Sequence, residues 1–291
     1  MSVILENGYL NENILMLDAN GWKNKKTTSS FIIIGKHVAI LDPAGSDSAD
    51  IILKLLDDFK IEKDSVRYIF VSHRHNDHSA GASILVKKLS KAVIYGHPIT
   101  IENLKNPEKI NDATRKMYGY LAEPIDPVKD MEKLVEIKDN NLFDLGNGIS
   151  VRALYMPGHT SDHLMFQETL NDFIFTGDGA GLFSGKYMTA LPNSFPPSFK
   201  YNEYKKSLTN LIEMKPKMLG FSHFGSIKGN DVNKVLIDSL NILEEWKEII
   251  SSHNDYENIL FYKYKNNFDL FSENFRDEVL RIIINGFAKN L

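Results

Sequence analysis

The feature that most constrains the fold of this chain is a histidine-rich segment that directly follows a short apolar run. Residues 68–71 (Tyr-Ile-Phe-Val) are bounded by polar residues, which predicts a buried β-strand. The next positions hold His73, His75, Asp77 and His78 within six residues. Imidazole and carboxylate groups are ligands that a borderline cation such as zinc accepts. We therefore interpret the end of this strand as a metal-binding position.

Three later strand-like segments also end in a potential metal ligand. These are His159 after residues 149–154, Asp178 after residues 173–177, and His223 after residues 218–222. Two of the three ligands follow a short motif, Pro-Gly before the histidine and Thr-Gly before the aspartate. Four predicted strands therefore end in side chains that can bind a metal ion.

Together these segments resemble the metallo-β-lactamase superfamily, whose pattern is H-x-H-x-D-H, a histidine after Pro-Gly, an aspartate after Thr-Gly and a late histidine. All seven positions of that pattern are filled here. The resemblance implies two metal ions, one bound by His73, His75 and His159, the other by Asp77, His78 and His223, with Asp178 bridging them. It also implies that Asp77 orients the attacking water or holds its proton.

The family fold implied by the resemblance is an α/β, four-layer αββα sandwich with a C-terminal helical extension. The chain's own patterns agree, because amphipathic helices such as residues 48–59 alternate with short apolar strands. We assign residues 1–228 to the metal-binding domain, with a helical insertion at about 98–141. Residues 229–291 form the extension, which either covers the core or forms the interface of a homodimer.

Composition limits the classes of function. The chain has 291 residues, is 43% hydrophobic and 25% charged, and carries a formal net charge of −4. This acidic balance favours a small-molecule substrate over nucleic acid. There are no cysteines, so any metal must be held by His, Asp or Glu. Neither a membrane-spanning run nor a signal pattern is found, so we expect a cytoplasmic protein that does not bind membranes.

The function implied by the resemblance is hydrolysis of an acyl bond, a thioester or lactone, by a hydroxide that bridges two metal ions. The activity would be glyoxalase II-like or lactonase-like. Zinc fits the ligands best, and iron or manganese would also fit. The alternatives are a persulfide dioxygenase-like oxidoreductase with one iron, a phosphodiesterase of the same fold, and a silent binding protein. A closed structural site needs only four donors, which argues against the last alternative.

Four residues are candidates for substrate binding. Lys186 and Tyr187 follow Gly185 in a sequence that resembles the thiol-conjugate loop of glyoxalase II enzymes, without the Glu-Gly that follows there. Tyr118 and Tyr120 lie in the insertion, where they either line the cleft or pack the insertion onto the body.

Two further residues are candidates for supporting the site. Asp42 ends a predicted strand, where it either supports the metal ligands or caps a turn. The resemblance makes His163 a supporting residue rather than a ligand.

Overall fold

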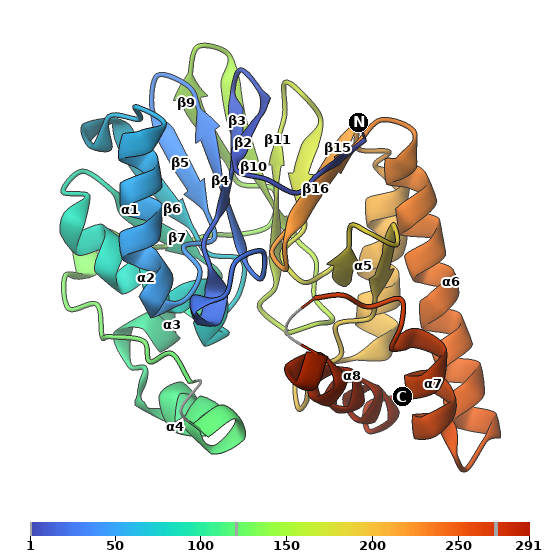
Figure 1. Ribbon diagram of the computed structural model, residues 1–291. Helices are drawn as coiled ribbons and strands as arrows, with labels where there is room; N and C mark the ends of the chain where they lie inside the picture. Colours follow the sequence, from blue (N-terminus) through green and yellow to red (C-terminus); the bar gives the residue numbers. More distant parts are fainter. Residues whose placement is uncertain (1, 120–121, 271–272) are drawn as a thin grey trace.

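The structure is a computed structural model that describes residues 2–119, 122–270 and 273–291. Two β-sheets lie face to face, and helices cover the outer face of each sheet, as Figure 1 shows. The predicted four-layer αββα sandwich is therefore confirmed. Within the described residues, no helix is long and apolar enough to cross a membrane.

The first sheet is built from the first half of the chain. Its order is β2 (Gly8–Asn11), β3 (Ile14–Asp18), β4 (Ser29–Ile34), β5 (Val38–Leu41), β6 (Val66–Phe70), β7 (Val93–Gly96) and β8 (Leu134–Glu136). The first four strands are antiparallel, and β5 to β8 run parallel. Parallel strands require crossover connections, which here are the outer helices.

The second sheet is built mainly from residues 142–228, and the N-terminal strand β1 pairs at its edge. Its order is β1 (Val3–Ile4), β16 (Gly225–Lys228), β15 (Met218–Phe221), β12 (Phe173–Phe175), β11 (Leu164–Glu168), β10 (Ile149–Tyr155) and β9 (Leu142–Gly146). Only β12 and β15 pair in parallel among these strands. A separate hairpin consists of β13 (Leu182–Ser184) and β14 (Thr189–Leu191).

The outer layers are formed by helices from different parts of the chain. The first sheet is covered by α1 (Ala49–Asp58), α2 (Asn76–Lys88) and α3 (Pro98–Lys105), and the second by α5 (Tyr201–Glu213) and α6 (Asp231–Ser252). The helices α4 (Glu108–Tyr118), α7 (Tyr256–Tyr264) and α8 (Glu273–Ala288) lie toward the lower ends of the sheets in Figure 1. Short 3₁₀ turns are η1 (Gly21–Lys23), η2 (Ser46–Ser48), η3 (Lys63–Ser65) and η5 (Met131–Lys133).

Aromatic rings fill the space between the two sheets. Phe70 of the first sheet packs on Phe166 of the second, with ring centroids 5.0 Å apart. Phe31 lies 5.3 Å from the ring of Phe173 and 5.5 Å from that of Phe175. This buried aromatic layer fixes the distance between the sheets, and so fixes where their strand ends meet.

The sequence predicted most elements, with three differences. Helix α2 begins at Asn76, so Asp77 and His78 lie in its first turn rather than in a loop. The predicted helical insertion contains α3 and α4, but its strand β8 extends the first sheet through β7. Helix α7 was not predicted from the sequence, and it packs with α6 and α8 against the core of the second sheet.

A glycine leaves room for two of the aromatic rings between the sheets. A Cβ atom added to Gly220 of β15 would lie 2.5 Å from Cζ of Phe31 and 2.8 Å from Cζ of Phe173. We expect Gly220→Ala to lower the free energy of unfolding by about 1–3 kcal/mol through overpacking, as measured by denaturant titration. Gly96→Ala, whose nearest contact is a Thr100 methyl group at 3.3 Å, is the matched control and should destabilise the protein less than Gly220→Ala.

Candidate metal centre and active-site cavity

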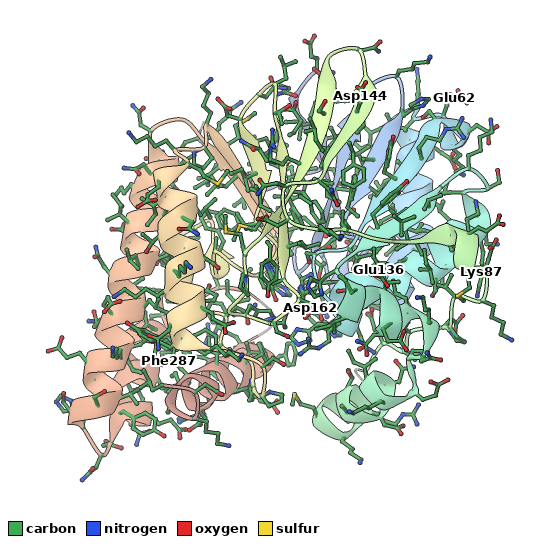
Figure 2. The ribbon with its side chains drawn as sticks, turned by 180° about the vertical axis from the view of Figure 1, so that it is seen from behind. Glu62, Lys87, Glu136, Asp144, Asp162 and Phe287 are labelled. Atoms are coloured by element: carbon green, nitrogen blue, oxygen red, sulfur yellow. The ribbon has the colours of Figure 1, made fainter. Side chains whose placement is uncertain are left out.

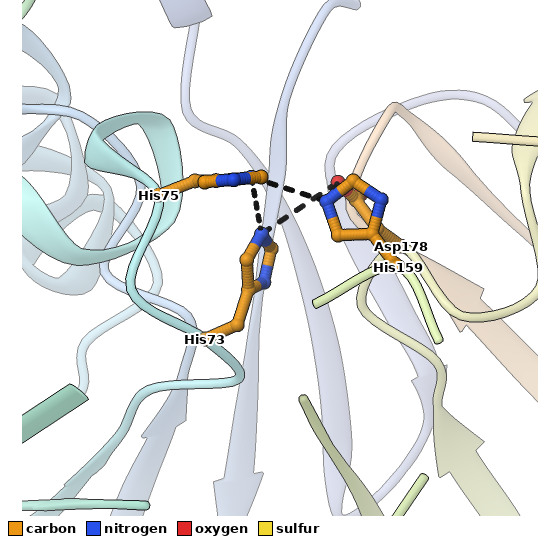
Figure 3. A group of neighbouring side chains, drawn as sticks. All are labelled: His73, His75, His159 and Asp178. Carbon is orange, nitrogen blue, oxygen red and sulfur yellow. Dashed lines mark hydrogen bonds and ion pairs between the residues drawn. The ribbon is translucent and has the colours of Figure 1, made fainter. Parts of the chain in front are cut away.

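Four side chains converge where the strands of both sheets end. His73 follows β6, His75 caps α2, His159 follows β10 and Asp178 follows β12, and their donor atoms lie within 4.8 Å of one another (Figure 3). Nδ1 of His75 is 3.0 Å from Nε2 of His73 and 3.1 Å from Nε2 of His159. A tetrahedral zinc ion with bonds of about 2.1 Å would separate its ligand atoms by about 3.4 Å. The cluster is therefore close to the size that one such ion requires.

A second group, Asp77, His78 and His223, lies beside the first. Oδ2 of Asp77 is 3.4 Å from Nε2 of His78 and 3.7 Å from Nε2 of His223. The first turn of α2 supplies two of these side chains, and the β15–β16 connection supplies the third. Residues more than 140 positions apart in the sequence thus meet at one point.

Asp178 contacts both groups. Its Oδ2 lies 3.1 Å from Nε2 of His159 and 3.4 Å from Nε2 of His78, and its Oδ1 lies 3.4 Å from Nε2 of His223. A carboxylate in this place can offer one oxygen to each of two cations. The structure thus brings together all seven residues that the sequence pattern singled out.

The other ring nitrogen of most of these histidines is held by a protein oxygen. The pairs are His73 with Ser72 Oγ at 3.0 Å, His78 with Asp42 Oδ2 at 2.8 Å, His159 with the Asn193 carbonyl at 2.7 Å, and His223 with the Thr27 carbonyl at 3.3 Å. Each bond uses Nδ1 as the donor, so the Nε2 lone pair faces the cluster. Nε2 of His78 is buried and has no hydrogen-bond partner in the described part of the chain. The donor set therefore fits a bound cation.

Asp42 is the residue that joins these supports. It is fully buried, and its Oδ1 accepts a hydrogen bond from the Ser72 backbone N–H at 2.6 Å. Its Oδ2 accepts from Ser72 Oγ at 2.7 Å and from His78 Nδ1 at 2.8 Å. One carboxylate thus orients ligands of both groups, so Asp42 supports the site rather than only capping a turn.

Burial and neighbouring charges shift the histidine pKa values of the two ligand groups in opposite directions. Burial and the neighbouring histidines hold the pKa of His73 well below its usual value, and burial with His159 lowers that of His75 to about 3. Burial also disfavours the charged form of His78, but Asp178 and Asp77 outweigh it and raise its pKa. The pKa of His223 is raised in the same way, mainly by Asp178 against burial.

An ion pair between the partly exposed Arg74 and the buried Asp162 supports the histidine-rich segment. Asp162 accepts a hydrogen bond from the Arg74 backbone N–H at 2.9 Å and pairs with the Arg74 guanidinium group. Thr100 donates to the same carboxylate at 2.8 Å. Figure 2 shows Asp162 near the centre of the view, at the lower ends of the sheets, whereas Phe287 lies among the C-terminal helices.

The cluster opens into a cavity of about 540 Å³. The insertion lines one part of it through α4, and the C-terminal helix α8 lines another. Trp22 stacks on His223 with ring planes 6° apart and meets Phe275 edge-on. The backbone of Trp22 has a φ of 51°, a strained conformation for a bulky residue that the surrounding contacts hold in place.

The four predicted substrate-binding residues have different outcomes. Lys186 and Tyr187 lie on the exposed turn between β13 and β14 and are not among the residues that line the cavity. Gly185 packs that turn against Leu5 near the N-terminus instead. Tyr118 ends α4, with its side chain outside the described residues, and Tyr120 lies outside them entirely.

Several residues of the cavity had no signal in the sequence. Trp22 and Glu123 line it from segments without a ligand-like pattern. Asn193 also lines it, and both polar atoms of its buried side chain have no hydrogen-bond partner in the described part of the chain. Asp162 could have been found, because it stands between His159 and His163 in a segment that the pattern already marked.

Comparison with known proteins places the chain among relatives of the same fold. Residues 24–223 match the family model described as the metallo-beta-lactamase superfamily. The chain is 30% identical over 203 residues to the metallo-beta-lactamase fold-containing protein ST1585 of Sulfurisphaera tokodaii, covering 68% of this chain and 72% of that one. A crystal structure of ST1585 matches with a TM-score of 0.71 and 26% identity, over 95% of this chain and 98% of that chain.

Two further relatives, matched over shorter stretches, are named as enzymes. A hydroxyacylglutathione hydrolase of Francisella tularensis is 29% identical over 143 residues, 49% of this chain and 42% of the relative. An atrochrysone carboxyl ACP thioesterase of Claviceps purpurea is 29% identical over 154 residues, 52% of this chain and 39% of the relative. The chain spans less than half the length of either relative.

His163 gives the site a measurable dependence on pH. Its Nε2 accepts the Asp178 backbone N–H at 3.1 Å, and burial with nearby His159 lowers its pKa to about 3. A histidine with a depressed folded-state pKa contributes stability above its unfolded pKa of about 6.5 and loses it as the pH falls. Between pH 7 and pH 5, the free energy of unfolding of the metal-free His163→Asn variant should therefore fall by about 2 kcal/mol less than that of the metal-free parent protein, as measured by denaturant titration.

The exposed His253 provides the control. His253→Asn should leave the loss of stability between pH 7 and pH 5 as it is in the parent protein. An equal loss in the His163 variant and the parent would show that His163 is not held neutral.

Proposed function

Because this chain belongs to the metallo-β-lactamase superfamily, we propose that it hydrolyses an acyl bond, a thioester or a lactone, with two divalent metal ions. It is an enzyme of that fold with a His/Asp site suited to binding metal. The observation that carries the proposal is the set of seven donors at the base of a largely apolar cavity. Such a cavity suits an acyl compound better than a polyanion.

The residues divide naturally between the two ions. His73, His75 and His159 would hold one, and Asp77, His78 and His223 the other, with Asp178 facing both. Zinc suits these nitrogen and oxygen donors best, and iron or manganese remain compatible with them. When bound, such ions lower the pKa of a coordinated water and polarise the carbonyl oxygen of a substrate.

Asp77 is the residue best placed to orient the attacking water and accept its proton. It lines the cavity, unlike His73 and His78, which lie behind it. Burial raises its pKa, but the charges of His78 and His223 outweigh burial and lower the pKa below its usual value. An ionised carboxylate on the cavity side can orient the water and accept its proton.

The substrate class rests on the cavity and on the relatives' names. Hydroxyacylglutathione hydrolase and acyl-carrier-protein thioesterase are both names of thioester hydrolases. Two cationic residues, Arg74 and Lys109, line the cavity, and Arg74 is paired with Asp162. A phosphodiester substrate would gain little from this arrangement. Because Lys186 and Tyr187 lie away from the cavity, the proposal does not extend to glutathione.

A small-molecule substrate, a homodimer and a cytoplasmic location stay predictions of this proposal.

The direct test is hydrolysis by protein purified without added metal. We expect about two zinc ions per chain by elemental analysis, and hydrolysis of thioesters or lactones that a chelator reduces at least 100-fold. Adding zinc back should restore the rate. Phosphodiesters serve as the comparison substrates and should react far more slowly.

A different result would assign another chemistry to the same ligands. One iron per chain with oxygen consumption on a persulfide, and no hydrolysis, would make the protein an oxidoreductase. Metal binding without any turnover would support the silent binding protein.

Acidification should separate the two metal sites. His73, His75 and His159 have lowered pKa values and release no proton when an ion binds. His78 and His223 have raised pKa values, so an ion must displace their protons, and its affinity falls as the pH falls. Between pH 7 and pH 5, bound metal measured after dialysis should drop from about two ions per chain to about one. Simultaneous loss of both ions would contradict this order.

A further inference from the structure

A glutamate from the insertion lines the cavity beside the metal ligands. Glu123 is 8% exposed, and its Oε1 lies 3.4 Å from the Trp22 backbone N–H. Its Oε2 is buried and makes no hydrogen bond of regular geometry in the described part of the chain, although the Ser46 backbone N–H lies close enough to the carboxyl group to lower its pKa. Burial, and then the charges of Asp77 and Asp47, raise its pKa to about 7. A buried carboxyl with unused hydrogen-bonding capacity requires an explanation, because such groups are costly.

A glycine leaves the space that this carboxyl group occupies. A Cβ atom added to Gly45 would lie 1.2 Å from Oε2 of Glu123. The backbone of Gly45 has a φ of −75°, which any residue can adopt. The need for glycine is therefore steric, and it comes from the carboxyl group of Glu123.

Buried amides place Glu123 relative to the metal ligands. Asn76, which stands between His75 and Asp77 in the sequence, donates to the Glu123 carbonyl at 2.7 Å and to Asn111 Oδ1 at 3.1 Å. Asn111 in turn exchanges two hydrogen bonds of 2.9 Å with the backbone of Ile125. The insertion is thus docked on the metal-binding loop, with residue 123 at the point of attachment.

The surroundings of Glu123 are mainly apolar. The cavity walls include Trp22, Ile110, Met117, Phe195, Phe275 and Val279. Several other polar side chains there already bond within the protein, such as Arg74 with Asp162 and Ser198, and Thr114 with Asn76, whereas the Asn193 amide has no hydrogen-bond partner in the described part of the chain. A polar group on a bound substrate would therefore find Glu123 in a mainly apolar wall that also holds the Asn193 amide.

We propose that Glu123 selects substrates whose apolar acyl chain carries a hydroxyl group, by forming a hydrogen bond with that hydroxyl inside the cavity. This inference rests on the proposed acyl hydrolysis and defines its substrate class. A carboxyl group can pair with a hydroxyl in either protonation state, because a hydroxyl both donates and accepts. An ammonium group is disfavoured, because metal ions bound in the same cavity would repel it.

The test compares thioesters that differ only in one hydroxyl group. The substrates are hexanoyl N-acetylcysteamine thioesters, either unsubstituted or hydroxylated at carbon 2, 3 or 4, assayed with metal-loaded full-length protein. We expect kcat/KM to favour one hydroxylated substrate about tenfold or more, and Glu123→Leu to bring that ratio close to one. Glu132→Leu, at an exposed glutamate of the same insertion, should keep the parent ratio.

A second variant moves the carboxyl group without removing it. Gly45→Ala places a methyl group where Oε2 lies, so it should lower the same ratio although Glu123 is still present. A merely structural role predicts that both variants slow all the thioesters equally and leave the ratio unchanged. That outcome, or the lack of preference for any hydroxylated thioester in the parent protein, overturns the proposal.

Binding of analogues that cannot be hydrolysed separates this inference from the proposed function. Ketones with a methylene group in place of the thioester sulfur can be titrated by calorimetry without turnover. The hydroxylated ketone should bind the parent about tenfold more tightly than the plain ketone, and Glu123→Leu should abolish the difference. If thioesters are not hydrolysed but this preference is present, the acyl hydrolase proposal fails while the role of Glu123 in recognition stands.

Discussion

Five imidazoles and two carboxylates share one largely buried space between the ends of the two sheets, and the surrounding structure compensates for their desolvation. Burying such groups is costly unless each is paired or binds a cation. Asp42 offsets part of this desolvation by accepting hydrogen bonds from His78 and from Ser72, which in turn bonds His73. Aromatic packing between the sheets keeps the strand ends at the distance that the cluster needs. The fold and the site therefore depend on the same contacts.

Much of this arrangement could be predicted from the sequence, because the ligands are tied to residue type and order along the chain. Each of His73, His159 and Asp178 follows a short apolar run, and the shortness of these runs together with their flanking polar and glycine residues favours strands over helices. The family resemblance then supplies the grouping of the ligands. The start of α2 was harder to place, since Asn76, Asp77 and His78 carry no apolar period and only the three-dimensional contacts show that they are helical.

The walls of the cavity could not be predicted in the same way. Glu123 and Trp22 come from segments without a regular pattern, and they meet only because the insertion docks through Asn76. Lys186 and Tyr187 illustrate the opposite case, since a short local similarity placed them near the substrate and the β13–β14 turn directs them elsewhere. Contacts between distant segments decide specificity, and one sequence does not encode them as a visible motif.

The pairing of β1 with β16 has a consequence for synthesis of the chain. Val3 lies opposite Ile227, so the second strand of this pair leaves the ribosome long after the first. The first sheet, by contrast, uses only residues before 137 and can assemble while translation continues. His223 lies two residues before the start of β16, so the last ligand of the cluster and the partner of the N-terminal strand emerge almost together. Neither the second sheet nor the set of seven ligands can therefore be complete until about three-quarters of the chain has been made.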